Sequence, residues 1–114
     1  MTNGIQTIIY PVSDVAAAKA LFGPLLGVEP YADEVYYVGY KVAGQDIGLD
    51  PNGHKKGMTG PLPYVTVADI RAAFQTLLDG GAEATQEPKD VGGGKLIASV
   101  KDKDGNPIGL TQEP

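Results

Sequence analysis

Two aspartates in the segment QDIGLD (residues 45–50) are the side chains best suited to acid–base chemistry. In an extended segment, side chains alternate between two faces, so Asp46 and Asp50 share one face while the apolar residues take the other. A carboxylate acts as a general base when it is desolvated and lies within reach of a substrate proton. Carboxylates near strand ends are more often solvated or paired with a cation such as Lys41. Both interpretations of these two residues remain open.

Tyrosine is the second notable residue type: the chain has six tyrosines, two phenylalanines and no tryptophan. A tyrosine combines a flat apolar ring with a hydroxyl group, which suits the recognition of aromatic or conjugated molecules. Those near the middle strands are Tyr31, Tyr36, Tyr37, Tyr40 and Tyr64. The strand phase predicts that Tyr36 and Tyr40 fill the core and that Tyr37 and Tyr64 face away from it.

Several other catalytic and cofactor-binding patterns are missing. The absence of cysteine excludes disulfides, thiolate metal sites and cysteine nucleophiles. His54 is the only histidine, lies in a loop and has no identifiable partner for a catalytic triad, so we interpret it as a surface residue. The glycine-rich run at residues 92–94 precedes a strand and lacks the Ser or Thr of a phosphate-binding loop. It predicts a flexible hairpin connection, which could act as a lid.

Charge and hydropathy restrict the partners. The net charge is −5 and the basic residues are scattered, whereas nucleic-acid binding requires clustered Lys and Arg. No stretch approaches the roughly 18–20 apolar residues that span a bilayer, and the first residues do not read as a signal peptide. We therefore expect a cytoplasmic protein with neither a nucleic-acid nor a membrane partner.

A length of 114 residues predicts one domain with one hydrophobic core. Within it, the order strand, helix, extended segment and hairpin occurs twice. Asp14 and Asp69 can cap the two helices, and the residues expected on the core faces of these helices are Val15, Ala18, Phe22, Leu25 and Leu26 in the first and Ile70, Phe74, Leu77 and Leu78 in the second. The two modules span approximately residues 4–51 and 61–113 and are joined by a loop at 51–60, in an α+β fold.

Each helix must bury its apolar stripe on one face of a sheet, which divides the strand residues into two sets. A two-residue hairpin loop at Ala43-Gly44 puts Tyr37, Gly39 and Lys41 on the face away from the helix, whereas a three-residue loop would invert this assignment. Small and polar residues on that second face favour a ligand cavity, with a solvent-facing surface or a dimer interface as alternatives. The residues we expect to bind the ligand are Thr7, Tyr37, Asp50, Tyr64, Ser99 and Thr111.

The segments PVSD (residues 11–14), VADI (67–70) and DKDGNPIGLTQ (102–112) resemble the glyoxalase/bleomycin-resistance/extradiol-dioxygenase superfamily, known as the vicinal oxygen chelate fold. The resemblance covers essentially the whole chain. It implies two repeated β-α-β-β-β modules that form a curled mixed sheet around a cleft, with the helices on the outer face. It also implies a small-molecule ligand and a homodimer.

Metal-dependent members of this superfamily bind a divalent ion through side chains on the concave sheet face. The positions to which the resemblance assigns these ligands hold Thr7, Gly48, Leu62 and Gly109. A divalent ion needs three or four convergent nitrogen, oxygen or sulfur donors, and a single threonine hydroxyl is a poor ligand. We therefore expect no metal and no cofactor, and we expect the glycines to open space for a ligand.

The resemblance and the missing ligands favour metal-independent binding of a small aromatic organic molecule or antibiotic, with sequestration of the bleomycin-resistance type. No catalytic residue is assigned. The alternative is a glyoxalase-like lyase, isomerase or dioxygenase acting on a small metabolite, either without a cofactor through Asp50 or Tyr37 or with unexpected metal ligands. A third interpretation is a dimeric interaction module.

Overall fold

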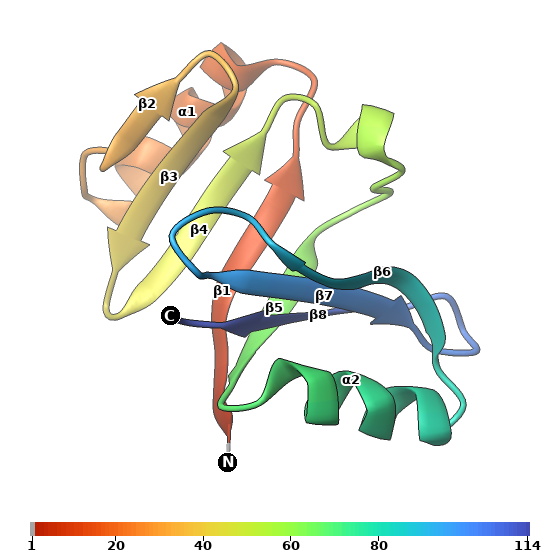
Figure 1. The fold of residues 1–114 in the computed structure, drawn as a ribbon. Helices are drawn as coiled ribbons and strands as arrows, with labels where there is room; N and C mark the ends of the chain where they lie inside the picture. The colour runs from red at the N-terminus through yellow and green to blue at the C-terminus, as the bar shows by residue number, and fades with distance from the viewer. Residues whose placement is uncertain (1) are drawn as a thin grey trace. The chain divides into compact units, whose positions relative to one another are not determined.

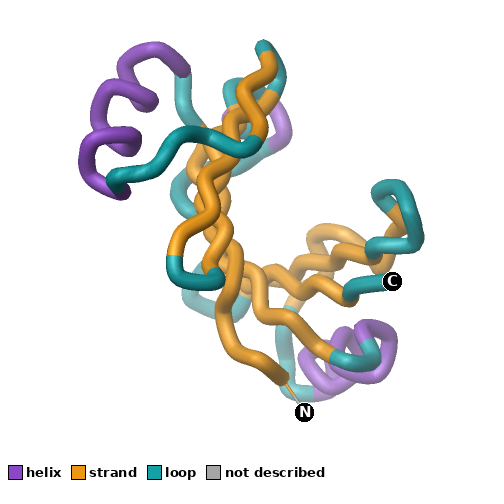
Figure 2. The backbone as a smooth tube through the Cα atoms, turned by 90° about the vertical axis from the view of Figure 1, so that its left-hand side faces the viewer, coloured by secondary structure: helices purple, strands orange, loops and turns teal. Residues whose placement is uncertain are grey.

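The computed structural model describes residues 2–114, which form two compact units. The N-terminal unit is Thr7–Leu62, and the C-terminal unit is Pro63–Pro114 together with the start of the chain up to Gln6. Each unit pairs one helix with one side of its strands, as Figure 1 and the tube in Figure 2 show. The predicted α+β fold and the repeated β-α-β-β-β order are confirmed.

The strands of the N-terminal unit lie in the order β2-β3-β4-β1. Their bounds are β1 Thr2–Pro11, β2 Ala32–Glu34, β3 Tyr37–Val42 and β4 Gln45–Asp50, and the part of β1 from Thr7 onward belongs to this unit. β1 runs parallel to β4, and β3 runs antiparallel to both β2 and β4. Ala43 and Gly44 form a two-residue turn with φ of 53° and 78°, the primed type that matches strand twist. This turn sets Lys41 opposite Asp46 and Gly39 opposite Gly48, which is the predicted register.

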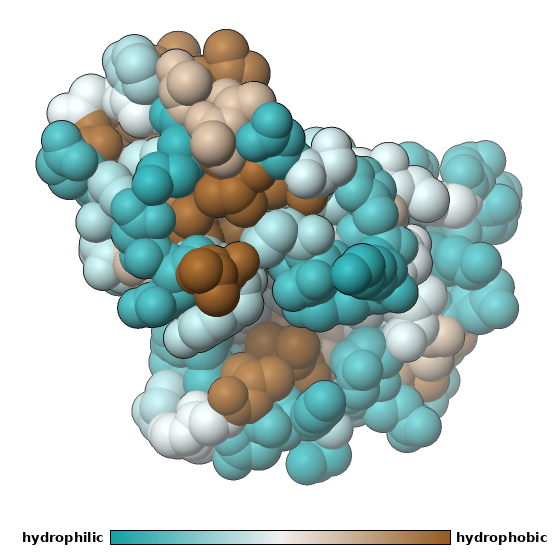
Figure 3. All heavy atoms as spheres, turned by 90° about the horizontal axis from the view of Figure 1, so that it is seen from above, coloured by the Kyte–Doolittle hydropathy of each residue, from teal (hydrophilic) through white to brown (hydrophobic). Residues whose placement is uncertain are grey.

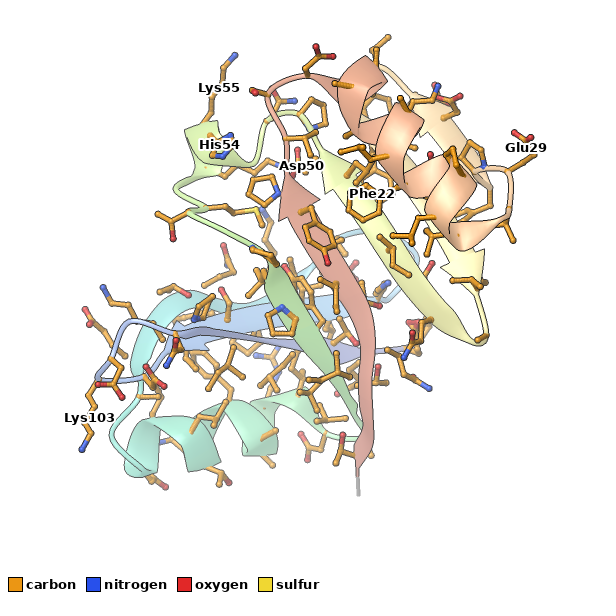
Figure 4. The ribbon with its side chains drawn as sticks, turned by 180° about the vertical axis from the view of Figure 1, so that it is seen from behind. Phe22, Glu29, Asp50, His54, Lys55 and Lys103 are labelled. Atoms are coloured by element: carbon orange, nitrogen blue, oxygen red, sulfur yellow. The ribbon has the colours of Figure 1, made fainter. Side chains whose placement is uncertain are left out.

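Helix α1 (Val15–Leu26) begins after Asp14, whose carboxylate accepts a hydrogen bond from the Ala17 N–H at 3.0 Å. Its inward side contributes to an apolar cluster with β3 and β4, and Figure 4 shows the Phe22 ring turned toward the strands. The cluster comprises Ala18, Val38, Tyr40 and Leu49, with Tyr10, Val12, Val15, Phe22, Leu26, Val28 and Ile47 around them.

The prediction that Leu25 faces this cluster is wrong, because its side chain is 75% exposed. Toward the end of α1 the buried stripe follows Phe22 and Leu26, which are four residues apart. Leu25 lies about 100° around the helix axis from Leu26 and therefore falls on the flank of the stripe. Leu21 is 71% exposed on the same outer side of the helix. Figure 3 shows a largely hydrophilic surface with apolar patches.

The strands of the C-terminal unit lie in the order β5-β8-β7-β6. Their bounds are β5 Leu62–Val67, β6 Glu83–Asp90, β7 Leu96–Lys101 and β8 Pro107–Gln112. β5 is parallel to β8, and the other pairs are antiparallel. Helix α2 (Ile70–Asp79) is capped by Asp69 and packs Ile70 and Phe74 against Ala98, Val100 and Leu110. This cluster is separate from that of the N-terminal unit, because each helix packs on the strands of its own module, so the one core expected is replaced by two.

The core prediction for Tyr40 is confirmed and that for Tyr36 is wrong. Tyr40 is 1% exposed, whereas Tyr36 is 63% exposed. Strand β3 begins only at Tyr37, so Tyr36 and the 94% exposed Val35 belong to the turn before it, outside the alternation of the strand. None of the helices in residues 2–114 is long and apolar enough to cross a membrane.

Candidate functional site

Three tyrosine side chains lie over glycines of the strands. The pairs are Tyr31 over Gly39, Tyr37 over Gly48, and Tyr64 over Gly109. A Cβ atom built on Gly39 would come within 2.7 Å of Cζ of Tyr31, and one on Gly109 within 2.6 Å of Cδ1 of Tyr64. A Cβ atom on Gly48 would overlap the Tyr37 hydroxyl. Each of these side chains therefore occupies the space that a larger residue would fill, an arrangement that stabilises glycine in a strand.

The expectation that Gly48 and Gly109 open space for a ligand is consequently wrong. The volume above Gly48 is taken by the Tyr37 hydroxyl and by Cδ1 of Ile9, and that above Gly109 by the Tyr64 ring. The glycines instead allow tyrosines to lie close to the backbone. Each unit thus presents tyrosine, rather than a recess, on the strand face that points away from its helix.

In the N-terminal unit, the hydroxyls of Tyr31 and Tyr37 lie beside a carboxylate. Burial raises the pKa of Tyr31 above its ordinary value, and hydrogen bonding to Asp46 raises it further. Burial also raises the pKa of Tyr37, an effect that the hydrogen bond with Tyr31 opposes and the negative charges of Asp46 and Asp50 reinforce. Both phenols are therefore protonated at neutral pH and can donate hydrogen bonds.

Asp46 is only partly satisfied. Its Oδ1 is buried and has no hydrogen-bond partner among the described residues, while its Oδ2 lies 3.8 Å from the Lys41 ammonium. The same ammonium lies 5.5 Å from the centroid of the Tyr31 ring, within cation–π range. Thr7 lies opposite Asp46 on the adjacent strand β1. A carboxylate, two phenols and a lysine therefore share the face of the N-terminal unit opposite α1.

Asp50, predicted both as a ligand contact and as a candidate base, is 7% exposed, and each of its carboxylate oxygens has a polar partner. Its Oδ2 lies 2.8 Å from the Lys56 ammonium, and its Oδ1 accepts a hydrogen bond from the Asn52 N–H at 2.8 Å. These contacts attach the following loop, which contains the 3₁₀ helix η1 (His54–Lys56), to the end of β4 (Figure 4). The ion-pair interpretation holds for Asp50, although its cation is Lys56.

The three predicted contacts in the C-terminal unit lie on neighbouring strands. Tyr64 is in register with Gly109 of β8, which is in register with Ser99 of β7. The Thr111 hydroxyl lies 3.2 Å from that of Thr66, and Thr111 is 5% exposed. The Ser99 hydroxyl bonds that of Thr85 at 2.8 Å. The face away from α2 therefore carries several hydroxyl groups and Tyr64, together with Ile97, which is in register with Thr111.

Tyr31 and Lys56 take part in the contacts described here, but neither was predicted from the sequence as a site residue. Tyr31 precedes the short strand β2, and nothing in its immediate sequence indicates that the side chain folds over Gly39 of the next strand. Lys56 belongs to a glycine-flanked loop whose path only the fold defines. His54 is exposed, as expected of a surface residue, and Figure 4 shows Lys55 beside it pointing away from the strands.

The residues present do not fit a divalent metal ion. Thr7, Gly48, Leu62 and Gly109 provide one weak donor among four positions. A longer side chain at either glycine would overlap a tyrosine. Within residues 2–114 there is no group of three or more His, Cys, Asp or Glu side chains that could hold an ion.

The phenol cluster predicts a specific loss of stability at alkaline pH. Because the folded-state pKa of Tyr31 and Tyr37 is raised, their contribution to stability is fully present below the unfolded-state value of 10.0 and is lost as the pH rises toward the folded-state values. We expect the melting temperature of the protein to fall more steeply above pH 10 than that of the Tyr31→Phe variant. Absorbance of tyrosinate measured during the titration should show these two phenols ionising only above their ordinary pKa of 10.0. An equally steep fall in the variant would contradict the prediction.

Comparisons with known proteins support the fold described above. A family model described as the Glyoxalase/Bleomycin resistance protein/Dioxygenase superfamily matches residues 4–110. No curated protein matches the sequence.

Solved structures match with low sequence identity. A superfamily member from Vibrio splendidus is 17% identical with a TM-score of 0.74, covering 99% of this chain and 100% of the other. Methylmalonyl-CoA epimerase from Mycobacterium tuberculosis is 17% identical with a TM-score of 0.71, covering 99% and 89%. The Mn(II)-bound glyoxalase from Novosphingobium aromaticivorans is 16% identical with a TM-score of 0.74, covering 97% of this chain and 39% of that one. At these identities the likeness concerns the fold alone. The family match over residues 4–110 establishes that the chain belongs to the glyoxalase/bleomycin resistance protein/dioxygenase superfamily.

Proposed function

We propose that this chain binds a small planar or aromatic organic molecule without a metal ion and acts by sequestering it. The observation that carries the proposal is the placement of Tyr31 and Tyr37 over glycines on the face of the N-terminal unit opposite α1. A ring held against the backbone leaves its outer surface for a second ring to stack on. Thr7 and Asp50 on that face, and Tyr64, Ser99 and Thr111 in the C-terminal unit, are the further contacts we propose.

The proposed platform is preorganised. Tyr31 is 56% exposed while the edge of its ring lies against Gly39, so its outward surface is available to a ligand. Tyr37 is half-buried and held by contacts with Gly48 and the neighbouring phenol. A ligand that stacks on side chains already fixed in place loses less conformational entropy on binding. This favours recognition of a flat molecule by the tyrosine rings of this face.

Sequestration requires affinity and a sufficient protein concentration, and no reacting group. The superfamily's usual metal positions are unsuited to an ion here, and Asp50 is tied to Lys56 and to the Asn52 amide. These features favour binding over catalysis. The homodimer that the resemblance implies and the cytoplasmic location expected from the sequence belong to the same proposal, and light scattering of the purified chain tests the first.

A second candidate, a cofactor-free lyase or isomerase, is favoured by one observation. Asp46 has a buried oxygen without a hydrogen-bond partner among the described residues and lies beside the protonated phenol of Tyr31. A desolvated carboxylate next to a proton donor is a pair suited to moving a substrate proton. Recovery of a bound compound in altered form would favour this candidate, and recovery unchanged would favour sequestration.

The experiment is a thermal-shift and fluorescence titration against naphthoquinones, flavonoids and anthracyclines. A compound that binds only the native state raises the melting temperature, and the chain's fluorescence comes from tyrosine because it has no tryptophan. For the best compound, Tyr31→Ala and Tyr37→Ala should each weaken binding about tenfold. Tyr36→Ala is the matched control, because Tyr36 is 63% exposed in the neighbouring turn and covers no glycine. The proposal fails if no compound binds, or if all three variants behave alike.

A further inference from the structure

We propose that the ligand carries a primary ammonium group, which binds between the Asp46 carboxylate and the Tyr31 ring in the position that the chain's own Lys41 occupies. This inference rests on the proposed function and specifies the charge class of the molecule bound. It follows from three features of Asp46 and its surroundings.

The first feature is the position of the Lys41 ammonium. It lies 5.5 Å from the centroid of the Tyr31 ring and 3.8 Å from Oδ2 of Asp46. An ammonium above an aromatic ring and beside a carboxylate has the two interactions by which proteins recognise organic cations. Lys41 can reach this position because it lies directly opposite Asp46 in the β3–β4 pair. Tyr31 and Asp46 therefore form a site suited to an ammonium group, and the Lys41 side chain occupies it.

The second feature is that the Lys41 ammonium is too far from Asp46 for a close ion pair. A charge-assisted N–H···O hydrogen bond is about 2.7–2.9 Å long, so the separation of 3.8 Å leaves Oδ2 without a close partner in Lys41. The Lys41 side chain is 64% exposed, which means that its charge loses little hydration by being there. A ligand ammonium that is not tethered to β3 can approach Oδ2 more closely than Lys41 does.

The third feature is that Asp46 differs from the other paired carboxylates of the same unit. Asp33 lies 2.7 Å from Lys19, and Asp50 lies 2.8 Å from Lys56 and also accepts the Asn52 N–H. Asp46 has the longest ion pair of the three and a buried Oδ1 with no hydrogen-bond partner in the part of the chain described. A carboxylate with a buried oxygen that lacks a hydrogen-bond partner gains from an added cation. The net charge of −5 draws cations toward the protein in addition.

A consequence of this geometry is competition between Lys41 and the ligand. Removing the lysine charge should therefore strengthen binding of an ammonium ligand, whereas removing a residue that contacts the ligand would weaken it. Lys41→Met keeps an unbranched side chain of similar length without its charge. Asp46→Asn keeps the shape of the carboxylate without its charge.

The test compares three probes of one shape and different charge: 2-phenylethylamine, 2-phenylethanol and 3-phenylpropanoate. Dissociation constants come from chemical-shift titrations of the full chain at pH 7 and low salt. We expect the amine to bind the unmodified protein at least fivefold more tightly than the alcohol, and the acid to bind most weakly. Asp46→Asn should remove the preference for the amine, and Lys41→Met should strengthen amine binding about threefold without changing that of the alcohol. Asp33→Asn is the matched control and should leave the preference intact.

The outcomes separate this inference from the proposed function. Equal binding of amine and alcohol to the unmodified protein, or tighter binding of the acid, overturns the ammonium assignment while the aromatic platform stands. Binding of none of the probes contradicts the platform itself. If Asp46→Asn does not fold, as judged by circular dichroism, Lys41→Met decides, and weaker amine binding in that variant overturns the inference.

Discussion

Replacing Gly48 with alanine should lower the free energy of unfolding by about 1–3 kcal/mol, the usual cost of adding a methyl group where none fits. The added Cβ would overlap the Tyr37 hydroxyl and come within 2.7 Å of Cδ1 of Ile9. The sign of the effect is informative. In an unobstructed strand the same change is favourable, because glycine in a strand interior costs roughly 0.5–1 kcal/mol relative to alanine. Urea unfolding followed by circular dichroism measures the difference.

A double-mutant cycle identifies the cause. In the background of Tyr37→Ala, the ring and hydroxyl that the new methyl group meets are gone, so Gly48→Ala should cost at least 1 kcal/mol less than it does alone. Gly60→Ala is the control, since a Cβ on Gly60 meets no atom within 4 Å. It should change the stability by less than about 0.5 kcal/mol. If the effects of Gly48→Ala and Tyr37→Ala are additive, the cost of the added methyl group does not come from its contact with Tyr37.

The segment around Gly48 also shows how far the sequence determines the site. Strand alternation places Ile47 and Leu49 toward the helix and Gly48 on the other face, and the two-residue turn at Ala43-Gly44 carries that phase to β3. Both conclusions depend on local periodicity and were predictable. The sequence could not predict which side chain lies above Gly48, because this depends on the rotamer of Tyr37, a residue of the neighbouring strand.

The same limit explains the other differences. The caps Asp14 and Asp69 were predictable, since a capping aspartate acts on the helix that follows it directly. The pairing of Asp50 with Lys56 was not, because it requires the path of the loop between β4 and β5. Leu25 was misplaced because apolar spacing in α1 allows two adjacent stripes, and the packing against β3 and β4 selects one of them. Contacts along one element were readable from the sequence, whereas contacts between elements required the structure.

This distinction bears on the function proposed. The sequence alone indicates that the superfamily's metal positions lack ligand side chains in this chain. This disfavours metal-dependent catalysis but does not indicate what the protein does instead. The structure adds that tyrosine lies over two of the vacant positions, Gly48 and Gly109. Aromatic side chains therefore lie where the resemblance would place metal ligands, and this difference is the physical reason to expect stacking rather than metal-assisted catalysis.

Replacing Leu49 with alanine should lower the free energy of unfolding by about 2–5 kcal/mol. Leu49 is 0% exposed and packs in the cluster with Val38 and Tyr40 beneath α1, so the shortened side chain leaves a cavity that its neighbours fill only in part.

Leu25→Ala is the matched control, because it removes the same atoms from a side chain that is 75% exposed. It should change the stability by no more than about 0.5 kcal/mol. Thermal and urea unfolding of the two variants under one set of conditions measures the contrast directly. Similar losses for both variants would place Leu25 in a buried interface, either with α1 turned by about 100° or with a second copy of the chain covering it. Unfolding at several protein concentrations separates these two cases, since only association makes the midpoint depend on concentration.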